Sequence, residues 1–299
     1  MRDRPGRPVK GAHHALCGAA AWVAVASNAP YTLGWYPVSS LGIVTGALVC
    51  AGAALAPDAD HHDATIAHSL PPVSEWVCDL VGRLAGGHRN GTHSVLGIAV
   101  LTGIAWAAGQ VTVATDALGD LAVGAGTMSL LLVAFAARAL RLARRRFDAW
   151  ALALALAGFI TVAAPTEWDW LPVAVGLGAA VHVAGDMLTG GGVPLLWPWE
   201  PRPPRWWRRA PVLNDLWSSG GNFAVPLLGT TGSWRERLLV APLTAYAAYG
   251  TGAALVVGSL TALGYDPDRV MDRVWDAANV LVGTATVVGT IAMTAPPPT

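Results

Sequence analysis

The sequence is poor in charge. Only 13% of its 299 residues are Asp, Glu, Lys or Arg, whereas a soluble domain usually carries about 25%. Nineteen basic residues balance nineteen acidic ones. This composition excludes a disordered chain and a protein that wraps nucleic acid, so no nucleic-acid partner is expected. It also disfavours an ordinary soluble enzyme, which leaves a large apolar core or a membrane protein.

The signatures of several catalytic classes are also missing. The three cysteines are far apart and no C-x-x-C occurs, so neither a thiolate zinc site nor a disulfide framework is indicated. No G-x-S-x-G is present, which disfavours a serine hydrolase of that type. Neither G-x-x-x-x-G-K-[ST] nor a convincing G-x-G-x-x-G occurs, so no nucleotide cofactor is expected.

Long apolar runs, in contrast, are frequent. A helix that crosses a bilayer needs about 20 mostly apolar residues. Spans are predicted at 12–28, 39–57, 93–113, 118–138, 149–165, 171–189, 238–260 and 276–294. The expected fold class is therefore all-α, a polytopic transmembrane bundle of about eight spans. We divide it into a membrane domain at 1–225, two C-terminal spans at 226–295 and a short disordered tail at 296–299.

The positions of Lys and Arg set the orientation of these spans, because basic residues concentrate in cytoplasmic loops. All but two of the nineteen basic residues precede the first span or lie in alternate connections that share one side. The other two, Arg269 and Arg273, lie beside acidic residues in the last outer loop. Both termini are therefore predicted to be cytoplasmic. The chain is expected to be a multi-pass protein of a bacterial inner membrane, with the lipid bilayer as a partner.

All eight histidines lie within the first 182 residues. The predicted topology, which makes no use of histidine, places every one of them at the cytoplasmic face. His182 and Asp186 are four residues apart in one span, so they share a face of the helix. Imidazole and carboxylate together suit a borderline divalent ion such as zinc. A buried His–Asp hydrogen bond that orients helices explains this pair equally well.

A second group of polar residues follows the second span. Asp58, Asp60, His61 and His62 come directly after Pro57. The two aspartates occupy alternate positions, so an extended turn would point both carboxylates to one side. A solvated loop that caps the helix would account for one or two such residues, but less well for four. Metal binding is the favoured interpretation.

The segment 87–94 is predicted to be a glycine-rich loop that leads into a helix. Thr92 or Asn90 is expected to cap that helix, which would place His93 in its first turn. His93 is then either a ligand or a capping residue. Arg89 is a natural clamp for a phosphate or carboxylate group, with a positive-inside anchor as the alternative.

A basic and aromatic segment follows the sixth span. Its arginines surround a pair of tryptophans, and its position beside a span favours anionic lipid headgroups over nucleic acid as the partner. The arginines are Arg202, Arg205, Arg208 and Arg209.

Four motifs resemble those of the YdjM-like inner-membrane proteins, a family of membrane-bound, metal-dependent hydrolases. They are His14 with Gly18, Pro57-Asp58-Ala59-Asp60-His61, His88-Arg89 through Thr92-His93-Ser94, and His182-Val183-Ala184-Gly185-Asp186-Met187-Leu188-Thr189 leading into Gly192-Val193-Pro194-Leu195-Leu196-Trp197-Pro198. The resemblance covers about residues 10–225. That family is in turn similar to zinc-dependent phospholipase C and P1-type nucleases, which are helical proteins with His and Asp zinc ligands.

The resemblance implies a set of site residues. The implied ligands are His14, Asp58, His93, His182 and Asp186, with His13 as the alternative to His14. The resemblance also implies that Asp60, His61 and His88 either support these ligands or are additional ligands, and His61 is assigned here as a ligand. Asp60 or His88 would act as general base, and Arg89 would hold the substrate anion.

The function expected is therefore that of a metal-dependent hydrolase. Zinc or another divalent ion at the cytoplasmic membrane face would act on a phosphodiester or ester of a lipid-like substrate. A transporter for a divalent cation or proton is one alternative, and it predicts acidic groups along several spans. A metal-stabilised membrane scaffold without catalysis is the other.

Overall fold

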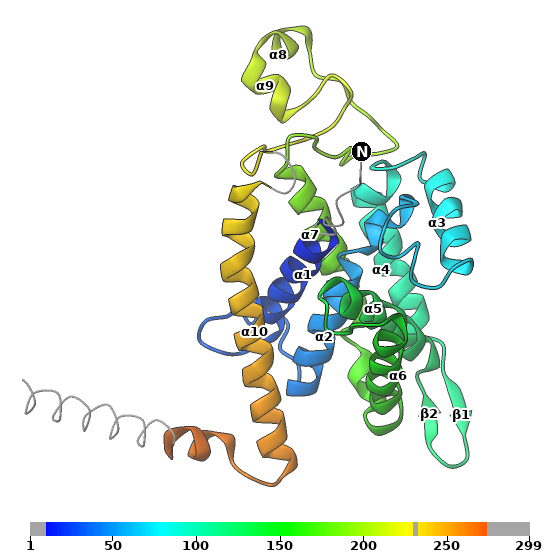
Figure 1. The fold of residues 1–299 in the computed structure, drawn as a ribbon, viewed down its shortest axis with the longest axis vertical. Helices are drawn as coiled ribbons and strands as arrows, with labels where there is room; N and C mark the ends of the chain where they lie inside the picture. Colours follow the sequence, from blue (N-terminus) through cyan, green and yellow to red (C-terminus); the bar gives the residue numbers. More distant parts are fainter. Residues whose placement is uncertain (1–9, 230–232, 274–299) are drawn as a thin grey trace, which may run out of the picture. The chain divides into compact units, whose positions relative to one another are not determined.

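The structure is a computed structural model in which residues 10–229 and 233–273 are described. The chain divides near Thr251 into two compact units, and all the residues discussed below as a site lie in the first. Figure 1 shows the order of the elements along the chain.

Helices make up most of the described chain. The α-helices are α1 (Lys10–Ala26), α2 (Ser40–Ala53), α3 (Val73–Leu84), α4 (Val95–Gly109), α5 (Val123–Ala139), α6 (Arg146–Ala163), α7 (Leu171–Met187), α8 (Arg205–Arg209), α9 (Pro211–Leu216) and α10 (Trp234–Ala262). Three short 3-10 helices are η1 (Ala56–Asp60), η2 (Gly91–His93) and η3 (Pro165–Trp168). The two strands are β1 (Val113–Thr115) and β2 (Gly119–Leu121).

Each predicted span that the structure describes contains a helix, although the span predicted at 118–138 also includes strand β2. Seven of the eight predicted segments correspond to α1, α2, α4, α5, α6, α7 and α10. Four helical stretches are long and apolar enough to cross a membrane, namely Ser40–Asp60, Arg146–Ala163, Pro165–Met187 and Trp234–Ala262. The predicted span at 276–294 and the tail at 296–299 lie outside the described residues. The count of eight and the cytoplasmic termini stay predictions.

Two features of the connections differ from the sequence prediction. The chain is not entirely helical, because β1 and β2 form an antiparallel hairpin between α4 and α5 in which Val113 pairs with Leu121. The segment 58–92, predicted as a loop, contains helix α3. One face of α3 is apolar and exposed: the side chains of Trp76 and Leu84 are 63% and 73% exposed. A stripe of this kind is typical of helices that lie in a membrane interface.

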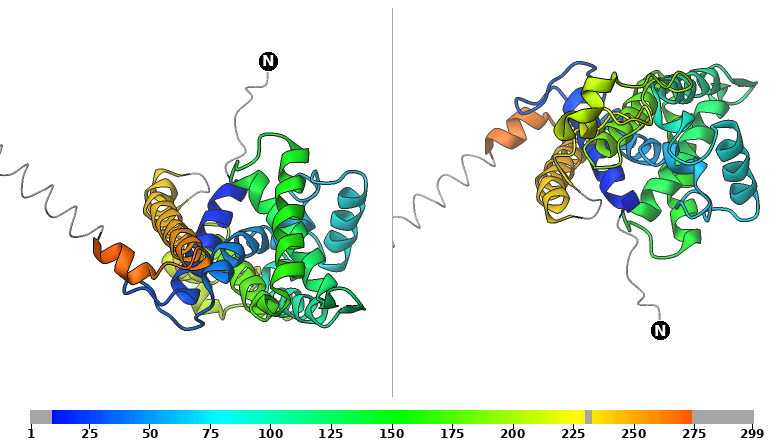
Figure 2. Two further views of the ribbon diagram at one scale, coloured as in Figure 1. Left: turned by 90° about the horizontal axis from the view of Figure 1, so that it is seen from below. Right: turned by 90° about the horizontal axis from the view of Figure 1, so that it is seen from above.

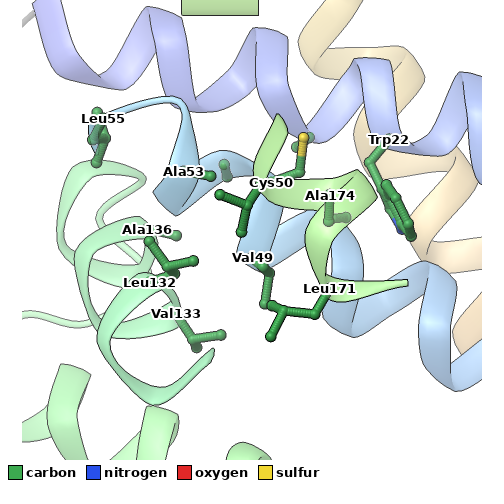
Figure 3. Packing of buried hydrophobic residues seen from close by; sticks show 14 of the residues in the cluster. Trp22, Val49, Cys50, Ala53, Leu55, Leu132, Val133, Ala136, Leu171 and Ala174 are labelled. Carbon is green, nitrogen blue, oxygen red and sulfur yellow. The ribbon is translucent and has the colours of Figure 1, made fainter. Parts of the chain in front are cut away.

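The core forms where α1, α2, α5 and α7 meet. Trp22 of α1, Val49 of α2, Val133 of α5 and Leu171 of α7 are fully buried and point into this region (Figure 3). The end-on views in Figure 2 show α5 and α6 packed together beside α2. Apolar side chains fill the middle of the bundle, so polar groups are left to gather at its ends.

Two glycines bring α1 and α7 against the same point of α2. A Cβ atom at Gly18 would lie 2.7 Å from the carbonyl oxygen of Cys50, and one at Gly178 only 2.5 Å from it. Small residues permit such close approach, on which helix association in membranes depends. His14 lies one turn before Gly18, and His182 lies one turn after Gly178. The close packing therefore also brings these two imidazole rings together, with centroids 4.0 Å apart.

Candidate metal centre

Five of the candidate ligands converge at one end of these helices. His14 lies near the start of α1, and Asp58 lies in η1 directly after α2. His93 ends η2 just before α4, while His182 and Asp186 lie in the last turns of α7. Because α1 and α4 begin where α2 and α7 end, side chains far apart in the sequence meet here.

The Nε2 atoms of two histidines each lie close to one oxygen of Asp58 and one oxygen of Asp186. The Nε2 atoms of His93 and His182 are 3.1 Å apart. Oδ1 of Asp58 lies 3.7 Å from Nε2 of His93 and 3.6 Å from Nε2 of His182. Oδ2 of Asp186 lies 3.5 Å and 3.8 Å from the same two nitrogens.

These spacings fit the donor set of a tetrahedral zinc site. Bonds of about 2.0–2.1 Å in tetrahedral geometry separate neighbouring ligand atoms by about 3.4 Å. The five distances above, from 3.1 to 3.8 Å, lie on both sides of that value. Two imidazoles and two carboxylates are also the donors that zinc accepts. The residues present therefore fit a divalent ion.

Hydrogen bonds fix which nitrogen of each imidazole faces these two carboxylates. Nδ1 of His182 donates to the carbonyl oxygen of Ala54, at 2.7 Å, in the last turn region of α2. Nδ1 of His93 lies 3.0 Å from the hydroxyl of Thr92 and 3.4 Å from Oδ2 of Asp60. Since both Nδ1 atoms serve as donors, both Nε2 atoms carry lone pairs. Two lone pairs 3.1 Å apart repel each other unless a cation or a proton lies between them.

Asp60 holds the loop around His93 in place. Its side chain is completely buried and accepts from Nδ1 of His88, from the backbone N–H of Arg89 and from the hydroxyl of Thr92, at 2.9, 2.9 and 2.6 Å. A carboxylate that orients a metal-binding histidine in this way is a recurrent feature of metal sites. Because both of its oxygens are engaged, we assign Asp60 to this orienting role and not to that of a general base.

His88 differs from Asp60 in being accessible. Its side chain is 40% exposed and lines the cavity described below. Its Nδ1 is held by Asp60, so Nε2 is the nitrogen that this hydrogen bond does not use. An imidazole held by a buried carboxylate is the arrangement that general acid–base catalysis uses.

Burial and the neighbouring carboxylates have opposite effects on the pKa of His93, and the effect of the carboxylates is the larger. Burial alone would lower the pKa of His93, whereas its hydrogen bonds and charge interactions with Asp58 and Asp60 raise that pKa to about 9. His93 lies in η2, before the first residue of α4. Near neutral pH the cluster without an ion therefore holds a proton at the place where a cation fits.

The two adjacent histidines of α1 have different neighbours. Nε2 of His14 lies 3.5 Å from Oδ1 of Asp186, so His14 approaches the carboxylate oxygen that the other donors leave free. His13 instead contacts Glu236 of α10 through a short hydrogen bond. Of the two alternatives, the structure brings His14 to the cluster. Glu236 was not singled out by the sequence, because nothing near it resembles a motif.

Two further expectations can be compared with the structure. His61 lies apart from His93 and His182; it groups with His62 and Asp63, a set that could itself hold an ion, and its Nδ1 accepts from the backbone N–H of Asp63. The cap of α4 is Ser94, whose hydroxyl accepts from the backbone N–H of Gly97, and neither Thr92 nor Asn90 has that role. The hydroxyl of Thr92 is already used by Asp60, which explains the shift.

Arg89 lies at the rim of the cluster. Its guanidinium is 3.2 Å from Oδ2 of Asp186, and its backbone has a left-handed conformation with φ of 60°. Such a conformation is uncommon for a residue with a side chain. The hydrogen bond from its N–H to Asp60 holds the backbone there. The guanidinium thus faces the same cavity as the candidate ligands.

A cavity of about 570 Å³ opens onto the cluster. His14, Asp58 and Asp186 line it together with His88 and Arg89. His93 and His182, which are fully buried, lie behind these residues. The cavity is large enough for a small substrate or a lipid headgroup.

A second cavity of about 360 Å³ reaches the cluster from another side and is mostly apolar. It lies among α1, α7 and the first part of α10, and Cys17, Val181, Leu239 and Tyr246 are among its lining residues. His14 and Asp186 line both cavities. The candidate metal centre therefore lies between a larger cavity of mixed polar and apolar lining and a smaller, apolar one.

The arginines of the basic and aromatic segment are exposed at the surface, in and beside α8. They are Arg202, Arg205, Arg208 and Arg209.

The model of the YdjM inner membrane protein family matches residues 9–262. The match extends through α10, well beyond the limit near 225 that the motifs suggested. No curated protein and no solved structure matches the chain.

Proposed function

Because the chain belongs to the YdjM inner membrane protein family, we propose that it is a metal-dependent hydrolase of that membrane. The proposed site is the His/Asp cluster, at the cytoplasmic face, and the proposed cofactor is zinc. The proposed substrate is a phosphodiester or ester of a lipid-like molecule.

One observation carries this proposal. Donor atoms of four side chains from three separate elements meet at the spacing of a tetrahedral zinc site, and one edge of the cluster borders a cavity. A helix-orienting hydrogen bond would need one histidine and one aspartate, not this set. Catalytic zinc sites differ from structural ones in keeping a coordination position open to water or substrate, and Asp58, 29% exposed at its side chain, is the most exposed of the three candidate ligands that border the cavity.

The chain's own residues have separable roles in this proposal. Asp58, His93, His182 and Asp186 would hold the ion, with His14 as a fifth donor. When bound, a divalent ion supplies Lewis acidity and a water of lowered pKa. His88 would exchange protons with the reacting groups, and Arg89 would hold the anionic group of the substrate.

The apolar cavity supports a lipid-like substrate. It adjoins the cluster at His14 and Asp186, within a protein whose helices lie in a membrane. A hydrocarbon chain placed there would leave its polar head at the ligands, on the side of the larger cavity. The proposal also assigns anionic headgroups of the surrounding lipid to Arg202, Arg205, Arg208 and Arg209.

Hydrolysis of a small chromogenic phosphodiester by the purified full chain, with zinc present, tests the proposal. We expect wild type to release product, and Asp186→Asn to lose at least about a hundredfold in kcat/KM, since it removes charge from a ligand. Asp63→Asn changes an exposed carboxylate at the same cavity and should retain activity. Equal rates in wild type and Asp186→Asn would refute the assignment.

A further inference from the structure

We infer that the larger cavity contains a second anion-binding subsite, formed by Arg138 and Arg141, for a negatively charged group of the substrate beyond the one at the metal ligands. This inference rests on the proposed function, because it concerns the same substrate. Both arginines line the cavity, and both come from the end of α5, an element that contributes no candidate ligand.

Arg138 has an unused donor. Its Nε atom is buried, yet no acceptor in the described part of the chain receives its hydrogen. Buried polar groups are nearly always hydrogen-bonded, so each exception calls for an explanation. Neither Arg138 nor Arg141 forms an ion pair with any carboxylate of the described residues. A guanidinium that borders a cavity without a partner is suited to a ligand with anionic oxygens.

Arg141 occupies a backbone position that favours glycine. It follows the last residues of α5 with φ of 57°, where helices commonly end in a left-handed residue that is usually glycine. Among the described residues other than glycine, Arg141 and Arg89 alone have positive φ, and both line this cavity. Strained backbone of this kind concentrates at functional sites.

The preference for basic residues beside a membrane span explains why arginines lie at this end of α5, but not why two of them line the cavity. Arg144, Arg145 and Arg146 follow in the same connection, are exposed, and do not line the cavity. They satisfy the preference for basic residues beside a span. Arg138, which is partly buried, and Arg141, which is exposed, differ from these three in lining the cavity, which that preference does not require.

Other charges in the cavity are already engaged. Arg89, 3.2 Å from Asp186, is assigned above to the anionic group at the metal ligands and so does not serve a second one. Asp63, which also lines the cavity, lies 3.4 Å from His62. Because the acids nearest to a bound substrate are ligands or have partners, Arg138 and Arg141 supply the excess positive charge. The substrate class that fits is a lipid phosphodiester whose head carries a further phosphate.

The matched probes are dihexanoyl phosphatidylglycerol and the same lipid with a phosphate on its distal glycerol hydroxyl. Binding to the full chain in detergent would be measured by equilibrium dialysis below the micellar concentration of the lipids, and hydrolysis in parallel. We expect wild type to bind the phosphate-bearing lipid at least about tenfold more tightly, since hydrogen bonds to charged groups are strong. Arg138→Gln should abolish this preference, and Arg144→Gln should retain it.

The Arg141→Gly variant distinguishes loss of the subsite from a folding defect. It removes the guanidinium while relieving the left-handed strain, so it should raise the midpoint of thermal unfolding, Tm, yet lose the preference. The inference is overturned if both variants bind the two lipids with the wild-type preference, or if Arg144→Gln loses it as well. If wild type prefers the phosphate-bearing lipid through Arg138 but hydrolyses neither lipid, the subsite stands and the hydrolase proposal is refuted. If wild type hydrolyses the lipids without that preference, the hydrolase proposal stands and the subsite is refuted.

Discussion

Replacing Gly178 by alanine is expected to disrupt the candidate metal centre without changing any ligand. The new Cβ would lie 2.5 Å from the carbonyl oxygen of Cys50 and 2.8 Å from Cβ of Ala53. Ordinary contact begins near 3.4 Å, so α7 would have to move away from α2 by about 0.9 Å in a closely packed interior. The obstacle is helix backbone, which cannot rotate out of the way as a side chain can.

The expected effects follow from that displacement. Overpacking of this kind costs about 1–3 kcal/mol of stability. His182 and Asp186 both lie on α7, so both would shift relative to Asp58 and His93. Metal sites tolerate distance errors of about 0.2 Å, well below the required movement. We expect zinc affinity to fall by about 10–100-fold, as it does when residues that orient ligands are replaced.

Gly103→Ala and Gly158→Ala are the matched controls, because a Cβ at either helix position meets nothing within 4 Å. They should raise stability by up to about 1 kcal/mol through helix propensity. Zinc affinity would be measured by competition with a chromophoric chelator, and Tm by thermal unfolding in detergent. Wild-type zinc affinity and Tm in Gly178→Ala would refute the packing argument.

Three further outcomes are expected. Asp60→Asn should weaken zinc binding by about 10–100-fold, because it impairs the orientation of His93; an unchanged affinity in the chelator competition would contradict this role. Since the pKa of His93 is raised to about 9, zinc must displace a proton below that pH, so its apparent affinity should rise by about tenfold per pH unit and level off above pH 9. A titration without pH dependence would count against it. Replacing Trp76 and Leu80 of α3 by serine should accelerate amide hydrogen exchange of that helix in lipid nanodiscs, whereas Glu75→Ser should not.

Part of the candidate site could be predicted because it depends on local geometry. A spacing of four residues places His182 and Asp186 on one helix face, and the alternation of basic connections places the other candidates at the same end of the bundle. The choice between His13 and His14 could not be made in this way. It depends on the packing of α1 against α2 at Gly18, and on Glu236 of α10, which contacts His13.

Other elements escaped the sequence prediction for physical reasons. Helix α3 has only 12 residues, so a search for runs of about 20 apolar residues passes over it. The helical spacing of Val73, Trp76, Val77, Leu80 and Leu84 is the signal that could have found it. For Asp60 the sequence left a supporting role, a ligand and a general base open; the choice depends on three donors that converge on its carboxylate from a loop, which no spacing in the sequence predicts.

The central claim is that the His/Asp cluster holds a divalent ion. The most direct test is the metal content of the purified full chain, measured by inductively coupled plasma mass spectrometry beside His93→Ala. We predict a stoichiometric divalent ion in wild type and its loss from His93→Ala, with circular dichroism confirming that the variant remains helical. A wild-type protein without bound metal after incubation with zinc, or an equal content in a folded His93→Ala variant, would contradict the account.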